Sequence, residues 1–265
     1  MTMSTSLTTE QIERYSRQIM IPDLGGKGQI RLRRARVLVV GAGGLGSPAA
    51  FYLAAAGVGT LGIIDPDRVE LSNLQRQILH FTPDLGRQKV NTAKEKLNRL
   101  NPDVEVIAHP LRLEQENAAE VLSQYDFIVD GSDNFPTKFV VNDTAVKLGK
   151  AFSHAGIVRL QGQTMTVIPG KSACYRCFFK EPPPSGEILS CEQAGILGAV
   201  AGTLGSIQAT EAIKYLAGWD EDLLTDRLLT YDAKSMRFHA VEIKKNPECI
   251  ACGTGSTKSQ RTMQY

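Results

Sequence analysis

Short, mainly apolar runs alternate with longer segments of mixed character through the first 150 residues. Each run has five or six residues, the length of a buried strand, and they lie at residues 36–41, 60–65, 104–108 and 126–130. The segments between them have the length and residue types of helices, at residues 47–56, 88–100 and 114–123. Because strands that alternate with helices form parallel sheets, the pattern predicts an α/β fold, a Rossmann-like and mostly parallel sheet with helices on both faces.

The second half of the chain has a different pattern. Strands are predicted at residues 151–154 and 163–168, a long helix rich in small residues at 198–217, and a terminal antiparallel pair at 227–232 and 236–243. Three consecutive prolines exclude a helix or central strand and predict a loop over residues 181–186. We therefore expect antiparallel strands to extend the sheet, and the polar residues 254–265 to form a flexible tail.

Composition narrows the classes of function. The chain has 265 residues, 42% of them hydrophobic, and 30 Lys and Arg against 28 Asp and Glu give a net charge of +2. So small an excess does not favour nucleic acid or an anionic membrane as a partner. No apolar run reaches the roughly 18 residues of a membrane span, and the first ten residues lack the apolar core of a signal peptide. We expect a cytoplasmic protein without nucleic acid or membrane partners.

Three glycines after the first apolar run, Gly41, Gly43 and Gly46, have the spacing of a dinucleotide-binding turn. The first would allow a tight turn, the second would let a phosphate approach the backbone, and the third would allow close packing of the next helix. The N-terminus of that helix offers N–H groups to an anion. Asp65 ends the second strand, where an acid accepts hydrogen bonds from a ribose. On these residues alone an NAD-dependent oxidoreductase is the default hypothesis, and a glycine turn without a ligand is the alternative.

Polar side chains after the next strands favour a triphosphate over NAD. Asn73 and Arg76 follow the second strand, Lys89 lies just downstream, and Asp133 and Asn134 follow the strand that ends at residue 130. Arg and Lys can neutralise phosphates, and Asp133 offers the carboxylate oxygen that Mg2+ prefers. Hydride transfer needs neither, so the set indicates nucleotidyl or phosphoryl transfer. The alternatives are that Lys89 is a solvated helix-face charge and that Asp133–Asn134 only cap a helix.

Four of the five cysteines form two Cys-x-x-Cys pairs, Cys174/Cys177 and Cys249/Cys252, and Cys191 is left over. In a reducing compartment such pairs favour metal binding over disulfides. Four thiolates suit a closed tetrahedral Zn2+ site, which has no position for a substrate and stabilises structure. The four histidines are scattered without ligand spacing and are interpreted as structural or surface residues: His80, His109, His154 and His239.

Six motifs occur in order along the chain: RYSRQ at 14–18, the glycine loop at 41–47, SNLQRQ at 72–77, GSDN at 131–134, CYRC at 174–177 and CIAC at 249–252. Together they resemble the ubiquitin-activating-enzyme-like family and, within it, the ThiF/MoeB/HesA group of sulfur-carrier adenylyltransferases. The resemblance implies a single adenylation domain over residues 10–253. Its nucleotide-binding half would cover residues 10–150, and its carrier- and zinc-binding half residues 151–253.

The resemblance also implies a reaction, the ATP-dependent adenylation of the C-terminal glycine of a small ubiquitin-like sulfur-carrier protein ending in Gly-Gly. Pyrophosphate would be released, and the carrier would serve thiamin- or molybdopterin-type cofactor biosynthesis. By similarity, Gly44 belongs to the phosphate loop, Asp65 contacts the ribose, and Asp133 binds Mg2+ beside Asn134. Arg17 would reach the ATP of the partner subunit in a symmetric homodimer; its alternative, as for Lys89, is a solvated helix-face charge. The residues that would contact the triphosphate are Asn73, Arg76 and Lys89.

Cys191 stands where related proteins carry a cysteine that is covalently linked to the carrier in some members and is dispensable in others. The sequence leaves no room after the second cysteine pair for the sulfur-transfer domain that some relatives append. We therefore expect a separate protein to donate the sulfur. The alternatives are a nicotinamide-dependent oxidoreductase and a non-catalytic, nucleotide-regulated scaffold for a ubiquitin-like partner. A related enzyme that acts on a small carboxylate or on tRNA is a further one, which the paired cysteines and the proline-rich loop fit less well.

Overall fold

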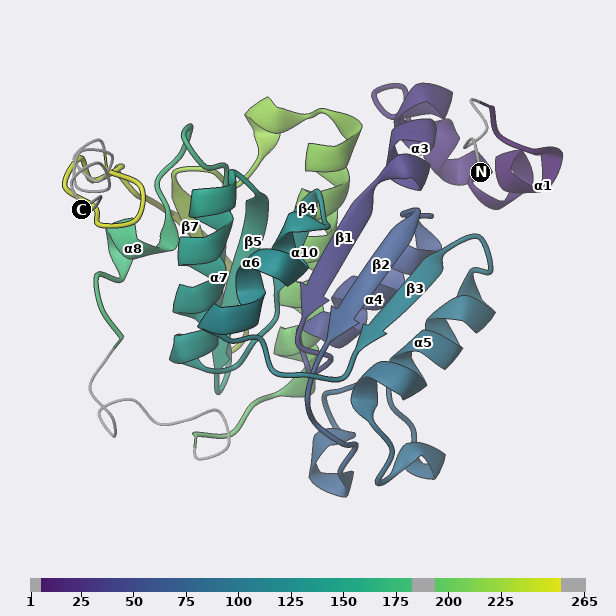
Figure 1. Ribbon diagram of the computed structural model, residues 1–265, viewed down its shortest axis with the longest axis horizontal. Helices are drawn as coiled ribbons and strands as arrows, with labels where there is room; N and C mark the ends of the chain where they lie inside the picture. Colours follow the sequence, from purple (N-terminus) through teal and green to yellow (C-terminus); the bar gives the residue numbers. More distant parts are fainter. Residues whose placement is uncertain (1–5, 183–193, 254–265) are drawn as a thin grey trace, which may run out of the picture.

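The computed structural model describes residues 6–182 and 194–253, which form an eight-stranded sheet with helices on both faces (Figure 1). The strand order is β3-β2-β1-β4-β5-β6-β7-β8. β1 to β5 pair in parallel, whereas β6, β7 and β8 continue the sheet as antiparallel strands. The predicted fold class is therefore confirmed. The strands are β1 (Arg36–Val40), β2 (Thr60–Ile64), β3 (Glu105–His109), β4 (Phe127–Asp130), β5 (Ala151–Val158), β6 (Gln161–Val167), β7 (Arg227–Asp232) and β8 (Arg237–Glu242).

Helices cover the two faces of the sheet. α4, α5 and α10 lie on one face, and α6 and α7 lie on the other. Among the described residues, no helix is long and apolar enough to cross a membrane. The helices are α1 (Thr9–Arg14), α2 (Ser16–Ile19), α3 (Gly25–Arg34), α4 (Gly46–Ala55), α5 (Lys89–Leu100), α6 (Gln115–Ser123), α7 (Phe135–Leu148), α8 (Tyr175–Phe178) and α10 (Gly198–Ala217), with short 3-10 turns η1 (Leu71–Asn73), η2 (Thr82–Asp84) and η3 (Asp220–Asp222).

Strand β1 shows how the sequence pattern builds two cores. Successive side chains of a strand point to opposite faces of the sheet. Val37 and Val39 belong to the core formed with α4 and α5, whereas Leu38 and Val40 belong to the core formed with α6 and α7. All four are at most 3% exposed. Because both faces are buried, the strand is a continuous apolar run rather than an alternating one, as is typical of a parallel sheet.

The sequence pattern did not predict α3, and it predicted β5 and β6 to be shorter than they are. α3 contains three glycines and four basic residues, so it carries a weak apolar pattern. Tertiary packing forms it, because Leu32 is fully buried against Leu24 and Ala217. Arg31 also donates a hydrogen bond to the Ala217 carbonyl at 2.6 Å. β5 and β6 are longer than predicted because they pair with each other as a hairpin beyond their apolar residues.

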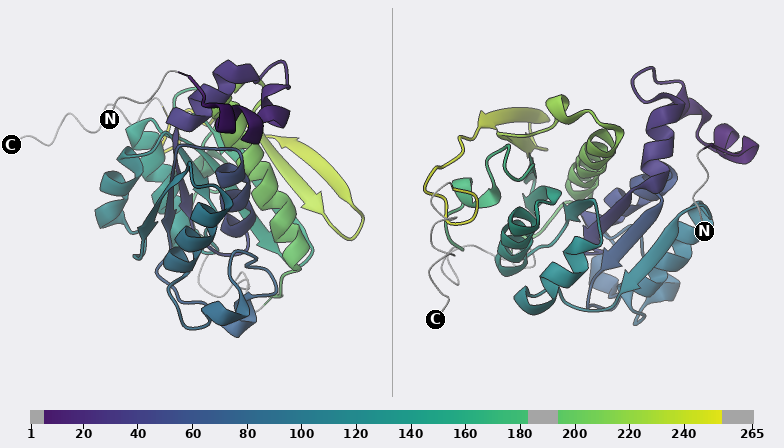
Figure 2. Two further views of the ribbon diagram at one scale, coloured as in Figure 1. Left: turned by 90° about the vertical axis from the view of Figure 1, so that its right-hand side faces the viewer. Right: turned by 45° about the horizontal axis from the view of Figure 1, so that its top comes forward.

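The predicted antiparallel pair at the end of the described chain is confirmed as β7 and β8. Figure 2 shows this hairpin extending from the body of the protein. All six residues of β8 are exposed, and Phe238 stacks on Tyr231 with 4.4 Å between the ring centroids. The aromatic pair therefore adds a side-chain contact to the backbone pairing of β8 with β7.

The carboxyl ends of β1, β2 and β4 lie side by side, because β1 pairs with both other strands. Gly41 follows β1, Asp65 follows β2, and the turn at residues 131–134 follows β4. Ligands of open α/β sheets bind at this edge. The polar segments that the sequence singled out are therefore neighbours in space.

Candidate functional site

The glycine loop at residues 41–46 joins β1 to the first turn of α4. Gly41 has a φ of 90°, a left-handed conformation that favours glycine. A Cβ added there would lie 2.9 Å from Gly131 O, and one at Gly46 would overlap the carbonyl oxygen of Gly41. At Gly43 the nearest atom to an added Cβ is Gln77 Nε2, at 3.7 Å. Two glycines thus serve the turn and helix packing, and the middle one leaves space beside the backbone at a helix N-terminus.

Asp65 is buried behind this loop, and backbone amides occupy both of its oxygens. Oδ2 accepts a hydrogen bond from the Ala42 N–H and Oδ1 from the Asp67 N–H, each at 2.8 Å. Lys89 Nζ is 4.0 Å from Asp65 Oδ1 and 3.1 Å from Asp67 Oδ2. Burial raises the pKa of Asp65, and the Lys89 charge acts in the opposite direction. The structure thus brings Lys89 to the predicted ribose acid and adds Asp67, which sequence reasoning missed.

His80 is a further residue that holds the loop. Its Nε2 lies 2.9 Å from Ala42 O, and its Nδ1 lies 2.8 Å from Thr92 Oγ1. Burial lowers the pKa of His80 to about 4, so the imidazole is neutral at pH 7. Because a carbonyl can only accept, Nε2 carries the proton and donates it to Ala42 O. The interpretation of His80 as structural is confirmed, but its spacing in the sequence does not reveal the contact with residue 42.

Asn73 and Arg76 belong to the segment that follows β2, and Arg76 reaches the glycine loop. Asn73 ends η1, and Arg76 Nη1 donates to Ser72 O at 3.0 Å. Arg76 Cγ is 3.5 Å from the position that a Cβ at Gly44 would take, so the arginine side chain begins against the glycine loop. Both side chains are partly exposed. The structure therefore places the base of the Arg76 side chain at the loop, whereas the Asn73 amide donates to Ser72 Oγ at 3.3 Å.

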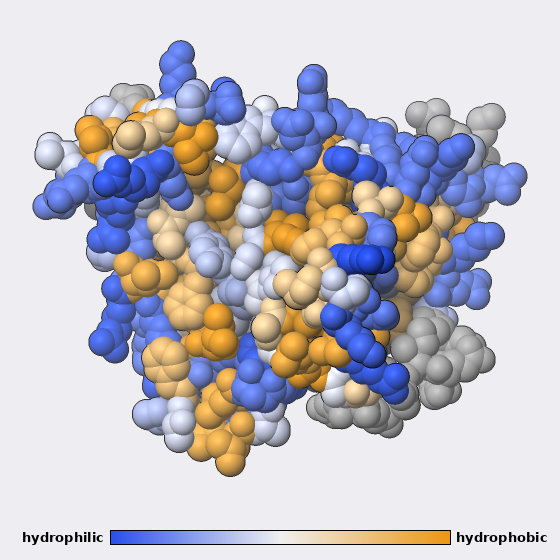
Figure 3. Space-filling model, turned by 180° about the vertical axis from the view of Figure 1, so that it is seen from behind, coloured by the Kyte–Doolittle hydropathy of each residue, from blue (hydrophilic) through white to orange (hydrophobic). Residues whose placement is uncertain are grey.

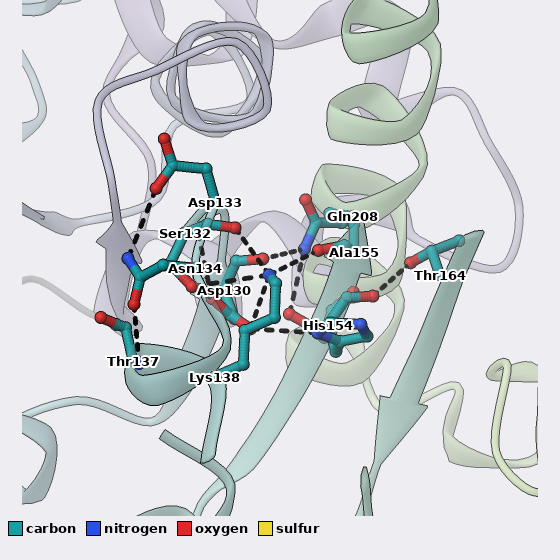
Figure 4. A network of polar contacts seen from close by, with 11 residues as sticks. Asp130, Ser132, Asp133, Asn134, Thr137, Lys138, His154, Ala155, Thr164 and Gln208 are labelled. Atoms are coloured by element: carbon teal, nitrogen blue, oxygen red, sulfur yellow. Dashed lines mark hydrogen bonds and ion pairs between the residues drawn. The ribbon is translucent and has the colours of Figure 1, made fainter. Parts of the chain in front are cut away.

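Of the two neighbouring residues Asp133 and Asn134, only Asn134 takes the capping role that the sequence left open. Asn134 is the N-cap of α7, because its Oδ1 accepts from the Thr137 N–H at 2.9 Å (Figure 4). Asp133 is exposed, and its Oδ1 accepts from Asn134 Nδ2 at 3.4 Å. Its oxygens are therefore open to a cation at the carboxyl edge of the sheet, and oxygen is the donor that Mg2+ takes. Capping falls to Asn134, which leaves the carboxylate of Asp133 available.

Arg17 is not brought to the glycine loop of its own chain. It is exposed on α2, where its Nη1 lies 4.0 Å from Met20 Sδ. The neighbouring Gln18 donates to Ala56 O, at the C-terminal end of α4. The glycine loop is at the other end of this ten-residue helix, about 15 Å away. Within one chain, Arg17 and the predicted phosphate site are therefore separate.

The four paired cysteines come together, as predicted. The Sγ atoms are 3.6 Å apart for Cys174 and Cys249 and 3.4 Å apart for Cys177 and Cys252, and all four lie within 4.8 Å of one another. Four sulfurs at about 2.3 Å from one tetrahedral centre would be about 3.8 Å apart, so the cluster fits Zn2+. Burial raises the pKa of the Cys174 thiol, so a bound cation would have to displace its proton.

The remaining predictions concern residues outside those described. Cys191 and residues 254–265 lie there, together with most of the proline-rich loop at 181–186. Their predicted roles stay predictions.

Known proteins match this chain over nearly its whole length. The ThiF family matches residues 15–251. The sulfur carrier protein adenylyltransferase of Thermus thermophilus is 46% identical over 258 residues, which cover 96% of this chain and 95% of that protein. The SAMP-activating enzyme E1 of Haloferax volcanii is 45% identical, with 99% and 97% covered. The probable adenylyltransferase/sulfurtransferase MoeZ of Mycobacterium tuberculosis is 47% identical, and this chain spans 63% of its length.

Solved structures show the same fold. Escherichia coli MccB with MccA-N7isoAsn superposes with a TM-score of 0.82 at 24% identity, over 94% of this chain and 76% of that one. MccB with AMPCPP and MccA gives a TM-score of 0.81 at 25% identity, over 91% and 74%. The family match and the relatives of equal length agree with the motifs and the fold. The chain therefore belongs to the ThiF family.

Proposed function

We propose that the protein adenylates the C-terminal glycine carboxylate of a small ubiquitin-like sulfur-carrier protein, using ATP and releasing pyrophosphate, for thiamin- or molybdopterin-type cofactor biosynthesis. A relative of nearly equal length, named sulfur carrier protein adenylyltransferase, supports the substrate class. One structural observation supports adenylation by ATP: the glycine loop, Asp65, Arg76 and Asp133 lie at one edge of the sheet. The names of the relatives favour this function over an oxidoreductase or a non-catalytic scaffold.

The reaction needs charge neutralisation rather than a general base. The carrier carboxylate is already an anionic nucleophile, so one of its oxygens forms the bond to the α-phosphorus as the bond to the pyrophosphate oxygen breaks. Negative charge then grows on pyrophosphate. Arg76 beside Gly44, together with the N-terminus of α4, would stabilise it. Asn73, at the end of η1, would donate to the same phosphates.

Asp65 would act at the ribose of ATP, and Lys89, which lies beside it, would act at the triphosphate. Backbone amides already fix the Asp65 carboxylate, so it can accept from ribose hydroxyls without rearranging. Lys89 is 94% buried at its side chain and pairs with the exposed Asp67. A phosphate that approached Lys89 would compete with Asp67 for the ammonium. Asp133 would hold Mg2+, which supplies positive charge to the phosphates when bound.

Arg17 would serve the second site of a symmetric homodimer. It is adjacent to Gln18, which lines an open groove of about 290 Å³ with Tyr52 of α4 and Ile213 of α10. Tyr52 is 58% exposed and Met20 is 69% exposed. Figure 3 views the protein from the side of these helices, where hydrophobic residues gather. A second copy that covered this face could carry Arg17 to the phosphates of its partner.

The four clustered cysteines would bind one structural Zn2+, away from the nucleotide. Sulfur would come from a separate donor protein, and Cys191 would take part only after adenylation, if it forms a link with the carrier. The cytoplasmic location stays a prediction.

Carrier-dependent exchange between ATP and radiolabelled pyrophosphate tests the proposal. Carriers are first captured with the intact protein and Mg-ATP, and those that end in Gly-Gly are then purified. We expect exchange with the intact carrier and none with the same carrier lacking its terminal Gly-Gly. Equal exchange with both carriers, or exchange with neither, would exclude the function.

A further inference from the structure

Asp133 lies on a turn whose inner side is held by a buried polar network (Figure 4). Asp130, the last residue of β4, accepts two hydrogen bonds from Ser132 on its Oδ1, from the N–H at 3.1 Å and the hydroxyl at 2.5 Å. Its Oδ2 faces Lys138 Nζ at 3.4 Å and His154 Nδ1 at 3.1 Å. The Asp130 carboxylate thus binds the turn through Oδ1 and the buried side chains of Lys138 and His154 through Oδ2.

Lys138 closes this network from the second turn of α7. Its Nζ donates to Ser132 O at 2.6 Å and to Ala155 O at 2.7 Å, and it pairs with Asp130. An ammonium group has three protons, so these partners use all of them. The side chain is only 7% exposed. Lys138 therefore sets the position of a carbonyl group one residue before Asp133.

Burial and neighbouring groups shift the pKa values of Asp130 and His154. Burial opposes ionisation of Asp130, but Lys138 and His154 outweigh it, and the pKa of Asp130 lies below its ordinary value. Burial lowers the pKa of His154 to about 4, and the Lys138 charge acts in the same direction. The neutral imidazole donates from Nδ1 to Asp130. Around pH 7 Asp130 is therefore a carboxylate and His154 a neutral imidazole.

The outer side of the same turn contacts the glycine loop. Gly131 O lies 2.9 Å from the position of a Cβ at Gly41, and a Cβ at Gly131 would be 3.0 Å from Gly46 N. The turn is thus confined between the predicted phosphate site and Lys138. Since the backbone on both sides is closely packed, a change at Lys138 would be transmitted to Asp133 rather than absorbed.

We propose that Lys138 is a positioning residue for the Mg2+ site, which holds Ser132 O and thereby sets the carboxylate of Asp133 relative to the glycine loop. The proposal rests on the proposed nucleotide function of the same site. Groups that orient a metal ligand typically change metal affinity or activity by roughly 10–100-fold. The effect should therefore appear in Mg2+-dependent nucleotide binding and not in nucleotide binding without the metal.

Calorimetric titration with AMPCPP, in Mg2+ and separately in EDTA, tests this role without turnover. Lys138→Met should weaken binding about tenfold in Mg2+ and less than about twofold in EDTA. Lys138→Arg keeps a cation with several donors and should recover most of the affinity. Lys147→Met changes an exposed lysine of the same helix and is the matched control, which should bind as the wild type does.

A second variant covers the case in which Lys138→Met does not fold. Asp130→Asn combined with Lys138→Met removes both buried charges and keeps an acceptor for Ser132 at position 130, so the same Mg2+-dependent loss is expected. An unchanged affinity in Mg2+ in a folded variant, or an equal loss in EDTA, would overturn the proposal. A wild-type protein that binds AMPCPP but does not exchange pyrophosphate would instead contradict the proposed function and leave the role of Lys138 standing.

Discussion

The nucleotide end of the sheet and the cysteine cluster use polar side chains in opposite ways. At the nucleotide end, Asp133 is exposed and Arg76 is partly exposed, so both can meet a ligand. In the cluster, Cys174 and Cys249 are buried, and the four sulfurs face one another within 4.8 Å. Polar groups that a ligand can contact are suited to catalysis, whereas groups that contact only one another and a bound metal are suited to stabilising the fold. Changes at the first region should therefore lower activity without unfolding the protein, and changes at the second should do the reverse.

Helix α7 connects the two regions, so they are not structurally independent of each other. It begins beside Asp133 with Asn134 as its cap. Further along, Asp143 forms two 2.7 Å contacts with Arg176, which lies inside the first cysteine pair. Asn142 accepts from the backbone N–H of Tyr175 at 2.8 Å. A change of structure at the cysteine cluster can thus be transmitted along α7 to the nucleotide end. Activity and stability must therefore be measured on the same variants.

The largest effect is expected at the nucleotide end. Asp133→Ala should lower carrier-dependent exchange by about 100-fold or more, because the growing charge on pyrophosphate loses its metal. The melting temperature should stay within about 2 °C of the wild type, since the side chain is exposed. Glu120→Ala, at an exposed acid of α6, is the matched control. Exchange at the wild-type rate would remove Asp133 from the mechanism.

Mixing two inactive variants tests whether the nucleotide end is completed by a second copy. Arg17→Ala and Asp133→Ala subunits should each lack exchange, yet a heterodimer contains one site with its own Asp133 and the partner's arginine. Random mixing should therefore restore about a quarter of the wild-type activity. Heterodimers that form but stay inactive would show that Arg17 does not act across the dimer.

At the cysteine cluster the order of effects should reverse. Cys249→Ser should lower the melting temperature by at least about 5 °C, because a closed metal site contributes folding free energy. Exchange per folded molecule should stay within about threefold. Elemental analysis should find one zinc per wild-type chain and less in the variant. Freshly purified wild-type protein without zinc would contradict the assignment of the cluster.

The smallest effect on adenylation is expected at Cys191. Because an acyl adenylate forms without a thiol, Cys191→Ala should leave exchange within about twofold and zinc content unchanged. Transfer of sulfur to the carrier, measured with the separate donor present, should fall if a covalent link is needed. A folded variant that had lost exchange would place Cys191 in the nucleotide or carrier-tail site.

The sequence predicts those features that depend on nearby residues. β1 can be recognised in the sequence because its buried residues are consecutive. The glycine loop can be recognised because the glycines that its backbone conformation requires lie within six positions. The cysteine cluster joins residues 75 apart, but paired thiols reveal it. The contacts of His80 with Ala42 and of Lys138 with Ala155 cannot be predicted in this way, because only the folded sheet brings these residues together. α3 was missed because its three glycines disfavour a helix and its basic residues leave few apolar positions, so the burial of Leu32 is what stabilises it.

Mass spectrometry of the carrier tests the central claim most directly. The purified protein is incubated with Mg-ATP and an intact Gly-Gly carrier, without a sulfur donor, and the carrier is analysed under acidic conditions that preserve a mixed anhydride. We expect the carrier to gain the mass of one adenylyl group, and to gain none with Asp133→Ala. A carrier of unchanged mass beside a folded wild-type protein that consumes no ATP would contradict the account.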